Sequence, residues 1–358
     1  PNTELLKIKI RDKYVLVTGA GGSIGSELCR QIVILRPKKL ILFEINEFSL
    51  YQVELELRKI NLQGIEIVPI MGSIRDRKRL EIIFNHYMIQ TIYHAAAYKH
   101  VPLVESNQSE GVLNNIIGTM RVAEAAIATK VETFVLISTD KAVRPSNTMG
   151  ATKRVAELVL QALAKESSST CFTMVRFGNV LDSSGSVIPL FKKQINEGGP
   201  VTVTDINIVR FFMTISEAVE LVIQAGAMGK GGDVFVLDMG EPVKIYELAK
   251  KMIQLSGLQL KDENNPDGDI EVKFTGLRPG EKLYEELLIG ENSIKTDNTL
   301  IMRAEEKMLD WSVLKPIIEE LHQSALEFDN NKIRELLIKI VPEFNPQSIA
   351  PQQIKTTI

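Results

Sequence analysis

The sequence has little cysteine and histidine, and this scarcity excludes whole classes of protein. Two cysteines and four histidines occur among 358 residues, with no spacing typical of a structural metal site or a disulfide framework. Cys29 and Cys171 each lie in an apolar stretch. We therefore expect two buried, reduced thiols and no metal ion.

The sequence also lacks a long hydrophobic run and a cluster of basic residues. No apolar run reaches the roughly 18 residues that a membrane helix needs, and no signal peptide opens the chain. The formal net charge is −3 and the basic residues are dispersed, a pattern that does not favour binding to nucleic acid or to a membrane surface. Hydrophobic residues make up 44% of the chain, enough for a large core and two lobes.

Short apolar runs alternate with helix-period segments over the first half of the chain. This alternation is typical of a parallel sheet with helical crossovers. It predicts an α/β fold of the Rossmann type, a doubly wound sheet with ligands at the carboxyl ends of its strands. The expected strands are Tyr14–Thr18, Lys39–Phe43, Ile65–Ile70, Thr91–His94, Thr133–Ser138 and Phe172–Arg176. The expected helices are Ser23–Leu35, Glu47–Ile60, Asn107–Thr129 and Met149–Lys165.

A glycine-rich turn follows the first expected strand and opens the first expected helix. Gly19, Gly22 and Gly25 are spaced three residues apart, with Ser23 and Ile24 between the last two. Glycines permit a tight turn and a close approach of the backbone to a pyrophosphate, and the helix N-terminus supplies amide groups and a favourable dipole. The strand–turn–helix context therefore predicts a dinucleotide site.

Further cofactor contacts are expected where the next strands end. Glu44 ends the second strand, about 20 residues after the glycine turn, where a carboxylate accepts hydrogen bonds from the adenosine ribose. The same carboxylate repels a 2′-phosphate, so NAD is favoured over NADP. Ser73 and Ile74 follow the third strand, where adenine contacts are usual. Three small residues after the fourth strand let the backbone pack against the cofactor: Ala95, Ala96 and Ala97.

The second half of the chain has looser patterns, which predict a division into lobes. We expect residues 1–180 to form an NAD-binding Rossmann domain, to which later segments at about 205–240 return. Residues 181–300 mainly form a smaller, C-terminal substrate lobe. C-terminal helices follow at 301–341, and a frayed tail follows at 342–358.

Several motifs together resemble the extended short-chain dehydrogenase/reductase superfamily. Within it, the chain is most similar to the nucleotide-sugar 4,6-dehydratases of polysaccharide and glycan biosynthesis. The resemblance covers roughly residues 12–290. The segments that carry it are Val17–Glu27, His94–Pro102, Ser138–Val143, Met149–Lys153, Arg176–Val180 and Gly276–Lys282.

One branch of this family has a methionine where the superfamily normally has the tyrosine of its Tyr-x-x-x-Lys motif. Met149 and Lys153 occupy those two positions here. The branch acts on UDP-N-acetylglucosamine in bacterial protein glycosylation, and its members carry N-terminal membrane spans before a cytoplasmic catalytic part. Because the chain starts at Pro1, we expect it to be that catalytic part of a protein anchored in the inner membrane. A homodimer is compatible with the superfamily, in which dimers that pair two long helices are common.

The resemblance implies an NAD-dependent 4,6-dehydration of UDP-N-acetylglucosamine with retention at C5. The product is the UDP-4-keto-6-deoxy sugar, UDP-2-acetamido-2,6-dideoxy-hexos-4-ulose. The cofactor oxidises C4, a base removes the C5 proton, an acid expels the C6 hydroxyl, and C6 is then reduced. The reaction thus regenerates NAD in each turnover and needs one proton donor and one proton acceptor from the protein.

The hydroxyl, carboxylate and amine of residues 139–141 are the groups such a proton relay needs. We expect Thr139 to hold O4 of the sugar, Asp140 to be the acid at the C6 hydroxyl, and Lys141 to be the base at C5. Lys141 has to be neutral to act, so desolvation and nearby positive charge should lower its pKa from about 10.4. Met149 cannot exchange a proton and is expected to pack, whereas Lys153 is expected to hold the nicotinamide ribose.

Contacts to the UDP moiety are expected from the second half of the chain. Arg210 and Arg278 are candidates for the diphosphate, because guanidinium groups match phosphate oxygens. The resemblance implies that the other residues facing the nucleotide-sugar are Lys99, Asn179, Val187 and Glu281, the last on the uridine ribose. His94 ends a buried strand and is interpreted as a core histidine, whereas His100 lies where it can approach a substrate.

Three alternatives remain at this point. A dehydratase that inverts C5 and a nucleotide-sugar 4-epimerase keep the same cofactor and substrate class. Epimerases do not need the pair Asp140 and Lys141, which favours elimination. An NAD-binding regulatory protein without activity is the third alternative, and the loss of the tyrosine at Met149 is what motivates it.

Overall fold

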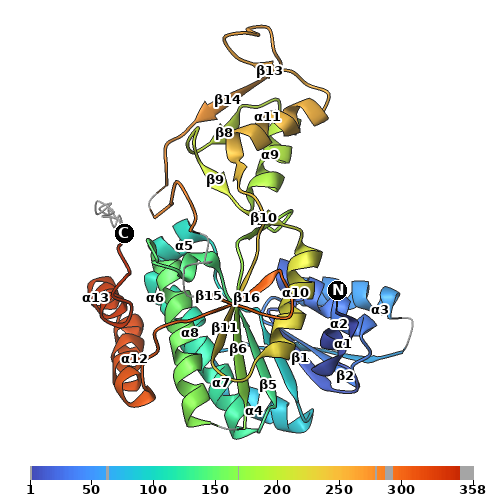
Figure 1. Ribbon diagram of the computed structural model, residues 1–358, viewed down its shortest axis with the longest axis vertical. Helices are drawn as coiled ribbons and strands as arrows, with labels where there is room; N and C mark the ends of the chain where they lie inside the picture. Colours follow the sequence, from blue (N-terminus) through green and yellow to red (C-terminus); the bar gives the residue numbers. More distant parts are fainter. Residues whose placement is uncertain (1, 62–63, 168, 279, 287–292, 347–358) are drawn as a thin grey trace, which may run out of the picture.

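Residues 2–61, 64–167, 169–278, 280–286 and 293–346 are described by the computed structural model of the chain. In this part of the chain, nine strands form one central sheet in the order β15-β16-β11-β6-β5-β4-β1-β2-β3 (Figure 1). The seven strands from β11 to β3 are parallel, as the alternating pattern predicts, whereas β16 runs antiparallel to β11 and to β15. The strands are β1 (Tyr14–Thr18), β2 (Lys39–Glu44), β3 (Glu66–Met71), β4 (Thr91–His94), β5 (Thr133–Ile137), β6 (Cys171–Arg176), β11 (Asp233–Leu237), β15 (Ser293–Lys295) and β16 (Ile301–Ala304).

Helices cover both faces of this sheet because each strand points its successive apolar side chains to opposite faces. Leu16 and Leu136 point to one face, and their neighbours Val15 and Val135 point to the other, as the period of a strand requires. The first face packs on α4 (Arg77–His86), the π-helical segment η1 (Val112–Gly118), α7 (Thr119–Ala128) and α8 (Thr148–Glu166). The second packs on α2 (Ser23–Ile34), α3 (Glu47–Ile60) and α10 (Ile215–Met228), with α1 (Thr3–Ile8) beside α10. The fold is therefore the predicted Rossmann type.

The expected helix at 107–129 is built from three consecutive pieces. They are α6 (Gln108–Gly111), the π-helical segment η1 and α7. A further short helix, α5 (Val101–Ser106), precedes them. The periodicity of apolar residues does not distinguish an α-turn from a π-turn, so the sequence did not indicate this break.

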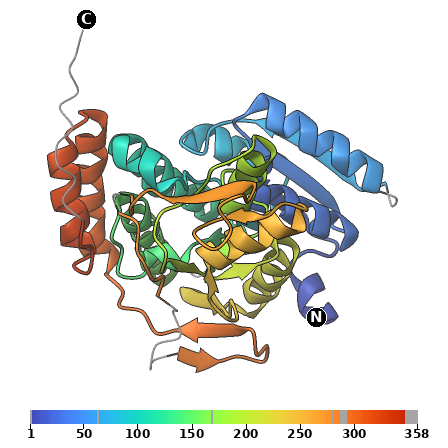
Figure 2. The same ribbon diagram turned by 90° about the horizontal axis from the view of Figure 1, so that it is seen from above.

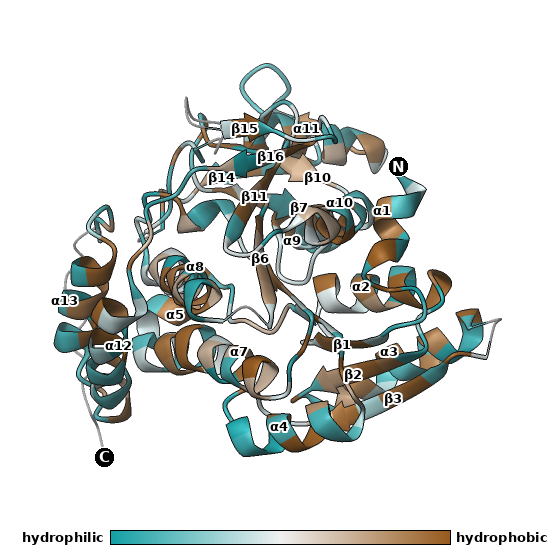
Figure 3. Cartoon of the chain, turned by 60° about the horizontal axis from the view of Figure 1, so that its bottom comes forward, coloured by the Kyte–Doolittle hydropathy of each residue, from teal (hydrophilic) through white to brown (hydrophobic). Residues whose placement is uncertain are grey.

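The last two helices lie along one side of the molecule. Helices α12 (Trp311–Leu326) and α13 (Asn330–Ile340) pack against α6 and α8, and α12 also packs against η1. Figure 2 shows the pair beside these helices, and Figure 3 shows hydrophobic residues interspersed with hydrophilic ones along both. They therefore cover one side of α6 and α8. The homodimer stays a prediction.

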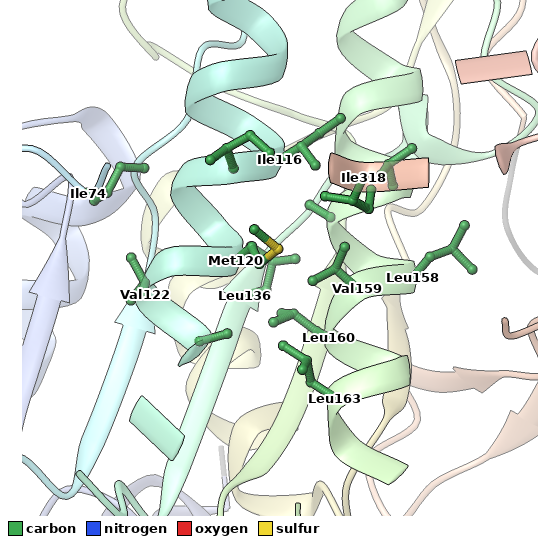
Figure 4. Packing of buried hydrophobic residues seen from close by; sticks show 14 of the residues in the cluster. Ile74, Ile116, Met120, Val122, Leu136, Leu158, Val159, Leu160, Leu163 and Ile318 are labelled. Atoms are coloured by element: carbon green, nitrogen blue, oxygen red, sulfur yellow. The ribbon is translucent and has the colours of Figure 1, made fainter. Parts of the chain in front are cut away.

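Close packing joins these C-terminal helices to the central sheet. Met120 from α7, Val159 from α8 and Ile318 from α12 lie within one cluster of buried side chains (Figure 4). Each of the three is at most 7% exposed. Helix α8 carries Met149 and Lys153. Because α12 packs closely against it, the position of α8 depends on the C-terminal helices.

Two expectations about the C-terminal region were wrong. Residues 301–341 are not helical from their start, because Ile301–Ala304 forms β16 and completes the sheet through long-range pairing with β11. The tail does not fray directly after Pro342. Phe344 is only 3% exposed within the main core, and the Asn345 amide donates to the Pro145 carbonyl oxygen. Residues 347–358 lie outside the described residues.

A smaller lobe stands above the carboxyl ends of the strands (Figure 1). Its core joins Phe191, Val201, Ile253 and Ile270 from four elements. Helix α9 carries Pro189 in its first turn, where proline is tolerated. The elements are β7 (Asn179–Val180), α9 (Val187–Asn196), β8 (Val201–Val203), β9 (Val209–Arg210), β10 (Phe212–Met213), β12 (Val243–Lys244), α11 (Ile245–Leu255), β13 (Leu260–Lys261) and β14 (Ile270–Phe274).

The buried position of Phe344 predicts a large cost for its truncation. We expect Phe344→Ala to lower the free energy of unfolding by roughly 3 kcal/mol or more, because a cavity opens beneath α12 and α13. Urea denaturation of the purified chain measures this loss. Glu343→Ala, at the exposed neighbouring residue, is the matched control and should change little. Equal stability of Phe344→Ala and wild type would contradict the packing described here.

Candidate active site

Two cavities lie at the carboxyl edge of the parallel strands, and they share five lining residues. The larger has a volume of about 640 Å³, and the smaller, of about 280 Å³, reaches toward the small lobe. The shared residues are Lys99, His100, Lys141, Asn179 and Ser186. The predicted residues that line only the larger cavity are Gly19, Gly22, Ser23, Ile24, Gly25, Ala95, Ala97, Thr139, Met149 and Lys153. Those that line only the smaller one are Val187, Arg210, Arg278 and Glu281.

The glycine turn forms a cradle that a side chain would fill. Gly19 has φ of +64°, and a Cβ atom there would lie 2.7 Å from the Ala96 nitrogen. A Cβ atom on Gly25 would lie 1.9 Å from the Gly19 carbonyl oxygen. Helix α2 begins at Ser23 directly after this turn, so the unpaired amides of its first turn are available to an anion. These residues fit the pyrophosphate of a dinucleotide.

Glu44 lies next to this cradle rather than in the wall of the cavity. One carboxylate oxygen accepts from the Gly21 amide at 3.1 Å, and the other accepts from the amides of Ile45 and Asn46 at 2.9 Å each. The carboxylate is therefore held rigidly beside the glycine turn. This position fits a partner for the adenosine ribose.

The other expected cofactor contacts divide into two groups. The backbone after β4 lies close to β1, since the Ala95 amide donates to the Thr18 carbonyl oxygen at 3.2 Å and the Ala96 amide to the Thr18 hydroxyl at 3.3 Å. Ser73 and Ile74 line neither cavity. Ile74 is buried in the main core, and the Ser73 hydroxyl accepts from the Arg75 amide.

The loop after β5 brings three reactive groups together. It begins with Thr139, and residues Asp140–Ala142 form a short 3-10 turn, η2. The Asp140 carboxylate accepts from the Thr139 hydroxyl at 2.9 Å and from the Lys141 ammonium at 3.1 Å. Lys141 also donates to the side-chain oxygen of Asn179 at 3.4 Å. Thr139 lines the larger cavity and Lys141 lines both, whereas Asp140 lines neither and lies behind them in contact with both side chains.

The expected low pKa of Lys141 is wrong for this structure. Burial alone would lower the pKa of Lys141, and Arg210 acts in the same direction, but the carboxylates of Asp140 and Glu285 outweigh both and raise it. The Glu285 carboxylate lies 3.4 Å from the Lys141 amine. The sequence did not indicate Glu285, which is distant along the chain and follows the last recognised motif. Lys141 is therefore held as an ammonium group.

Met149 and Lys153 occupy the first turns of α8, facing the larger cavity. Met149 is 3% exposed and presents a thioether where the superfamily has a phenol. The Lys153 amine donates to the Ile137 carbonyl oxygen at 2.7 Å. Burial lowers the pKa of Lys153 to about 8, against an opposing effect of Glu157. A group with this pKa changes charge near neutral pH.

The diphosphate candidates differ in how firmly they are held. Arg210 is mostly buried, and its guanidinium group lies 3.3 Å from Glu281 and 3.5 Å from Glu285. Arg278 is exposed, and its amide donates to the other oxygen of Glu281 at 3.0 Å. Glu281 therefore orients the guanidinium group of Arg210, whereas it holds Arg278 only through the backbone amide.

Two histidines lie near the site, and they differ in burial. His94 is fully buried between the hydroxyls of Thr18, at 2.7 Å, and Thr119, at 3.0 Å. Burial, with a smaller effect of Lys153, lowers the pKa of His94 to about 3, so the ring stays neutral. This confirms the interpretation of His94 as a core residue. His100 lines both cavities.

Comparison with known proteins assigns the chain to a family. The model of the family described as polysaccharide biosynthesis protein matches residues 15–306. The chain belongs to this polysaccharide biosynthesis family. It is 51% identical to the capsular polysaccharide biosynthesis protein CapD of Staphylococcus aureus over 94% of its own length and 54% of that relative. The chain thus spans about half the length of CapD.

Two further similarities place the family among proteins of related fold. The chain is 34% identical to a UDP-glucose 4-epimerase of Rickettsia rickettsii, with 80% of this chain and 81% of the relative covered. The solved structure of Pen from Bacillus thuringiensis is 36% identical, with a TM-score of 0.74, and the match covers 85% of this chain and 92% of that one. The fold of this family member is accordingly the extended short-chain dehydrogenase/reductase fold.

The described residues contain neither a membrane-spanning helix nor a cluster of metal ligands. No helix in these ranges is long and apolar enough to cross a membrane, and no group of three or more His, Cys, Asp or Glu side chains in them is arranged to hold a metal ion. Cys29 is buried as expected, whereas Cys171 is partly exposed.

A buried ion network next to Ser138, the residue before the loop of residues 139–142, was not predicted from the sequence. Arg176, at the end of β6, and Glu157, on α8, are both fully buried and lie 2.5 Å apart. The Ser138 hydroxyl donates to Glu157 at 2.6 Å, and Arg154 pairs with the same carboxylate at 3.0 Å. Both arginines also pair with Glu306, beyond β16. The network therefore connects β5, β6, α8 and the C-terminal region.

This network makes stability depend on pH in a defined direction. Burial alone would raise the pKa of Glu157, but Arg176, Arg154 and Ser138 outweigh it and lower the pKa from 4.5 to about 2. The ionised carboxylate therefore stabilises the fold above about pH 4.5, and this contribution is lost as the pH falls toward 2. We expect Glu157→Gln to lower the free energy of unfolding at pH 7 by roughly 3 kcal/mol, because two buried guanidinium groups lose their shared partner.

Chemical denaturation at a series of pH values measures this effect. The difference in unfolding free energy between wild type and Glu157→Gln should be largest at neutral pH and shrink below about pH 4.5. Glu166→Gln, at an exposed position on the same helix, is the matched control and should show no such difference. A deficit of Glu157→Gln that is independent of pH would contradict the assigned ionisation.

Proposed function

We propose that this member of the polysaccharide biosynthesis family is a UDP-N-acetylglucosamine 4,6-dehydratase that retains the configuration at C5. The observation that carries the proposal is the contact at 3.1 Å between Lys141, which lines both cavities, and the Asp140 carboxylate. Elimination across C5 and C6 requires a base that removes the C5 proton and an acid that protonates the C6 hydroxyl. An adjacent amine and carboxyl group can supply both.

The pair can reach its reactive form without gaining or losing a proton. Transfer of one proton from the Lys141 ammonium to the Asp140 carboxylate gives a neutral amine and a neutral carboxylic acid. The amine then accepts the C5 proton, and the acid donates its proton to the departing C6 hydroxyl, which leaves as water. Exclusion of solvent by a bound nucleotide-sugar favours the uncharged pair, because desolvation disfavours both charged forms.

The surrounding residues would bind the sugar and the cofactor. Thr139 donates a hydrogen bond toward Asp140 at 2.9 Å and would hold O4 of the sugar, whose proton would leave to water because Asp140 takes the Lys141 proton. Lys153 would bind the nicotinamide ribose, and Met149 would pack beside it. Glu44 next to the glycine turn favours NAD over NADP. NAD, when bound, supplies the oxidation at C4 and the reduction at C6.

The cavity toward the small lobe would take the UDP part of the substrate. Arg210 and Arg278 come from two different segments and can approach the diphosphate from two directions. Glu281 restricts the Arg210 guanidinium group, which reduces the cost of ordering it on binding. Uridine and the N-acetyl group are proposed on the sequence resemblance.

A second candidate function is a nucleotide-sugar 4-epimerase. The observation that favours it is the 34% identity to the Rickettsia relative named UDP-glucose 4-epimerase. An epimerase reduces C4 again without loss of water and so makes no use of an acid and a base at C5 and C6. A dehydratase that inverts C5 and a non-catalytic NAD-binding protein are the remaining candidates.

Proton NMR of the reaction in deuterated water distinguishes all these functions. We expect UDP-N-acetylglucosamine, without added reductant, to give a 6-deoxy methyl signal and deuterium at C5, because solvent supplies the C5 hydrogen. In a parallel reaction in ordinary water, the couplings of H5, recorded early, assign retention or inversion at C5. A 4-epimer without a methyl signal would establish the epimerase. Unchanged substrate and bound NAD would exclude activity on this substrate.

The absence of a phenol at position 149 gives a separate prediction. If the proton relay resides in residues 139–141, Met149→Tyr should not raise kcat, because the new phenol adds a group that the relay does not need. Met149→Leu is the matched apolar control and should keep most of the activity. Steady-state kinetics measure both variants. A large increase in kcat for Met149→Tyr would contradict the assignment of the relay.

A further inference from the structure

Glu285 is a buried carboxylate between Lys141, the proposed base, and Arg210, a candidate for binding the diphosphate. Its side chain is only 5% exposed, and it lies 3.4 Å from the Lys141 amine and 3.5 Å from the Arg210 guanidinium group. Burying a carboxylate is costly unless cations compensate it. Lys141 and Arg210 come from η2 and β9, so one carboxylate joins the catalytic loop to the candidate diphosphate site.

The segment that carries Glu285 is fixed against the catalytic loop by its backbone neighbours. The Lys282 amine donates to the carbonyl oxygens of Val143, at 3.3 Å, and Arg144, at 2.9 Å. The Gly280 carbonyl oxygen accepts from the side chains of Ser146, at 3.0 Å, and Asn147, at 3.1 Å. Glu285 is therefore held at a defined place relative to Lys141.

We propose that Glu285 is a positioning residue that fixes the Lys141 ammonium group between two carboxylates and so sets the protonation and direction of the proposed base. The role of Lys141 as that base rests on the proposed function, whereas the contact with Glu285 does not. Glu285 itself reaches the reacting atoms only through Lys141.

The charged groups around Lys141 decide what the removal of Glu285 does. Asp140 and Glu285 favour the ammonium form, whereas burial and Arg210 oppose it. Loss of one of two carboxylates leaves the opposing effects less compensated, so the pKa of Lys141 falls. Other ionisable residues that line the smaller cavity are Lys99, His100, Arg278, Glu281 and Lys282.

The direct test is the titration of Lys141 by NMR in the intact chain labelled with carbon-13 at the lysine ε position. Lys141→Arg assigns the signal. We expect Glu285→Gln to lower the pKa of Lys141 by roughly one pH unit or more, the effect of removing an opposite charge within about 4–6 Å. Glu285→Asp keeps the charge and should restore part of the difference. This measurement needs no turnover, so it stands even if the proposed reaction is wrong.

A matched control and a kinetic profile complete the test. Glu286→Gln removes the adjacent carboxylate, which pairs with Lys282 and Arg144 but not with Lys141, and should leave the Lys141 titration unchanged. If the chain is a dehydratase, the alkaline limb of its kcat/KM profile should move to lower pH in Glu285→Gln by the same amount as the NMR titration. An unchanged Lys141 pKa in Glu285→Gln, or an equal shift in Glu286→Gln, would overturn the proposal.

Discussion

The buried ion pair between Arg176 and Glu157 constrains the geometry of the whole candidate site. Neither charge has access to water, so each depends on the other and on the partners that join them. Through Ser138 the pair holds the end of β5, where the loop of residues 139–142 begins, and through Glu157 it holds α8. The same network includes Glu306 after β16. This loop is therefore positioned by charges that line neither of the two cavities.

A second group of charges surrounds Lys141 and has a different physical role. Asp140 and Glu285 hold Lys141 as an ammonium group, and Arg210 connects the group to the smaller cavity. In the proposed reaction Lys141 is a base held in its protonated form, which is useful only if its proton has a nearby acceptor. We propose that Asp140 is that acceptor and becomes the acid that the second half of an elimination requires. The arrangement thus links the resting state of the site to its proposed chemistry.

Sequence patterns predicted the features that depend on neighbouring residues. The glycine turn, the parallel strands and the loop with Thr139, Asp140 and Lys141 all follow from spacing within short segments. The missed features depend on contacts between distant segments. These include the pairing of Ile301–Ala304 with β11, the burial of Phe344, and the effect of Glu285 on Lys141. No local pattern records which carboxylate a folded chain will place beside a lysine.

In the proposed reaction, one site oxidises C4, eliminates water across C5 and C6, and reduces C6 without exchange of the cofactor. A single incubation with UDP-N-acetylglucosamine deuterated at C4, in ordinary water, tests this sequence of steps by NMR and mass spectrometry of the product. We expect the deuterium to appear in the C6 methyl group of a 4-keto product. Deuterium that stays at C4 of a product that has kept its C6 hydroxyl would contradict it and would identify an epimerase.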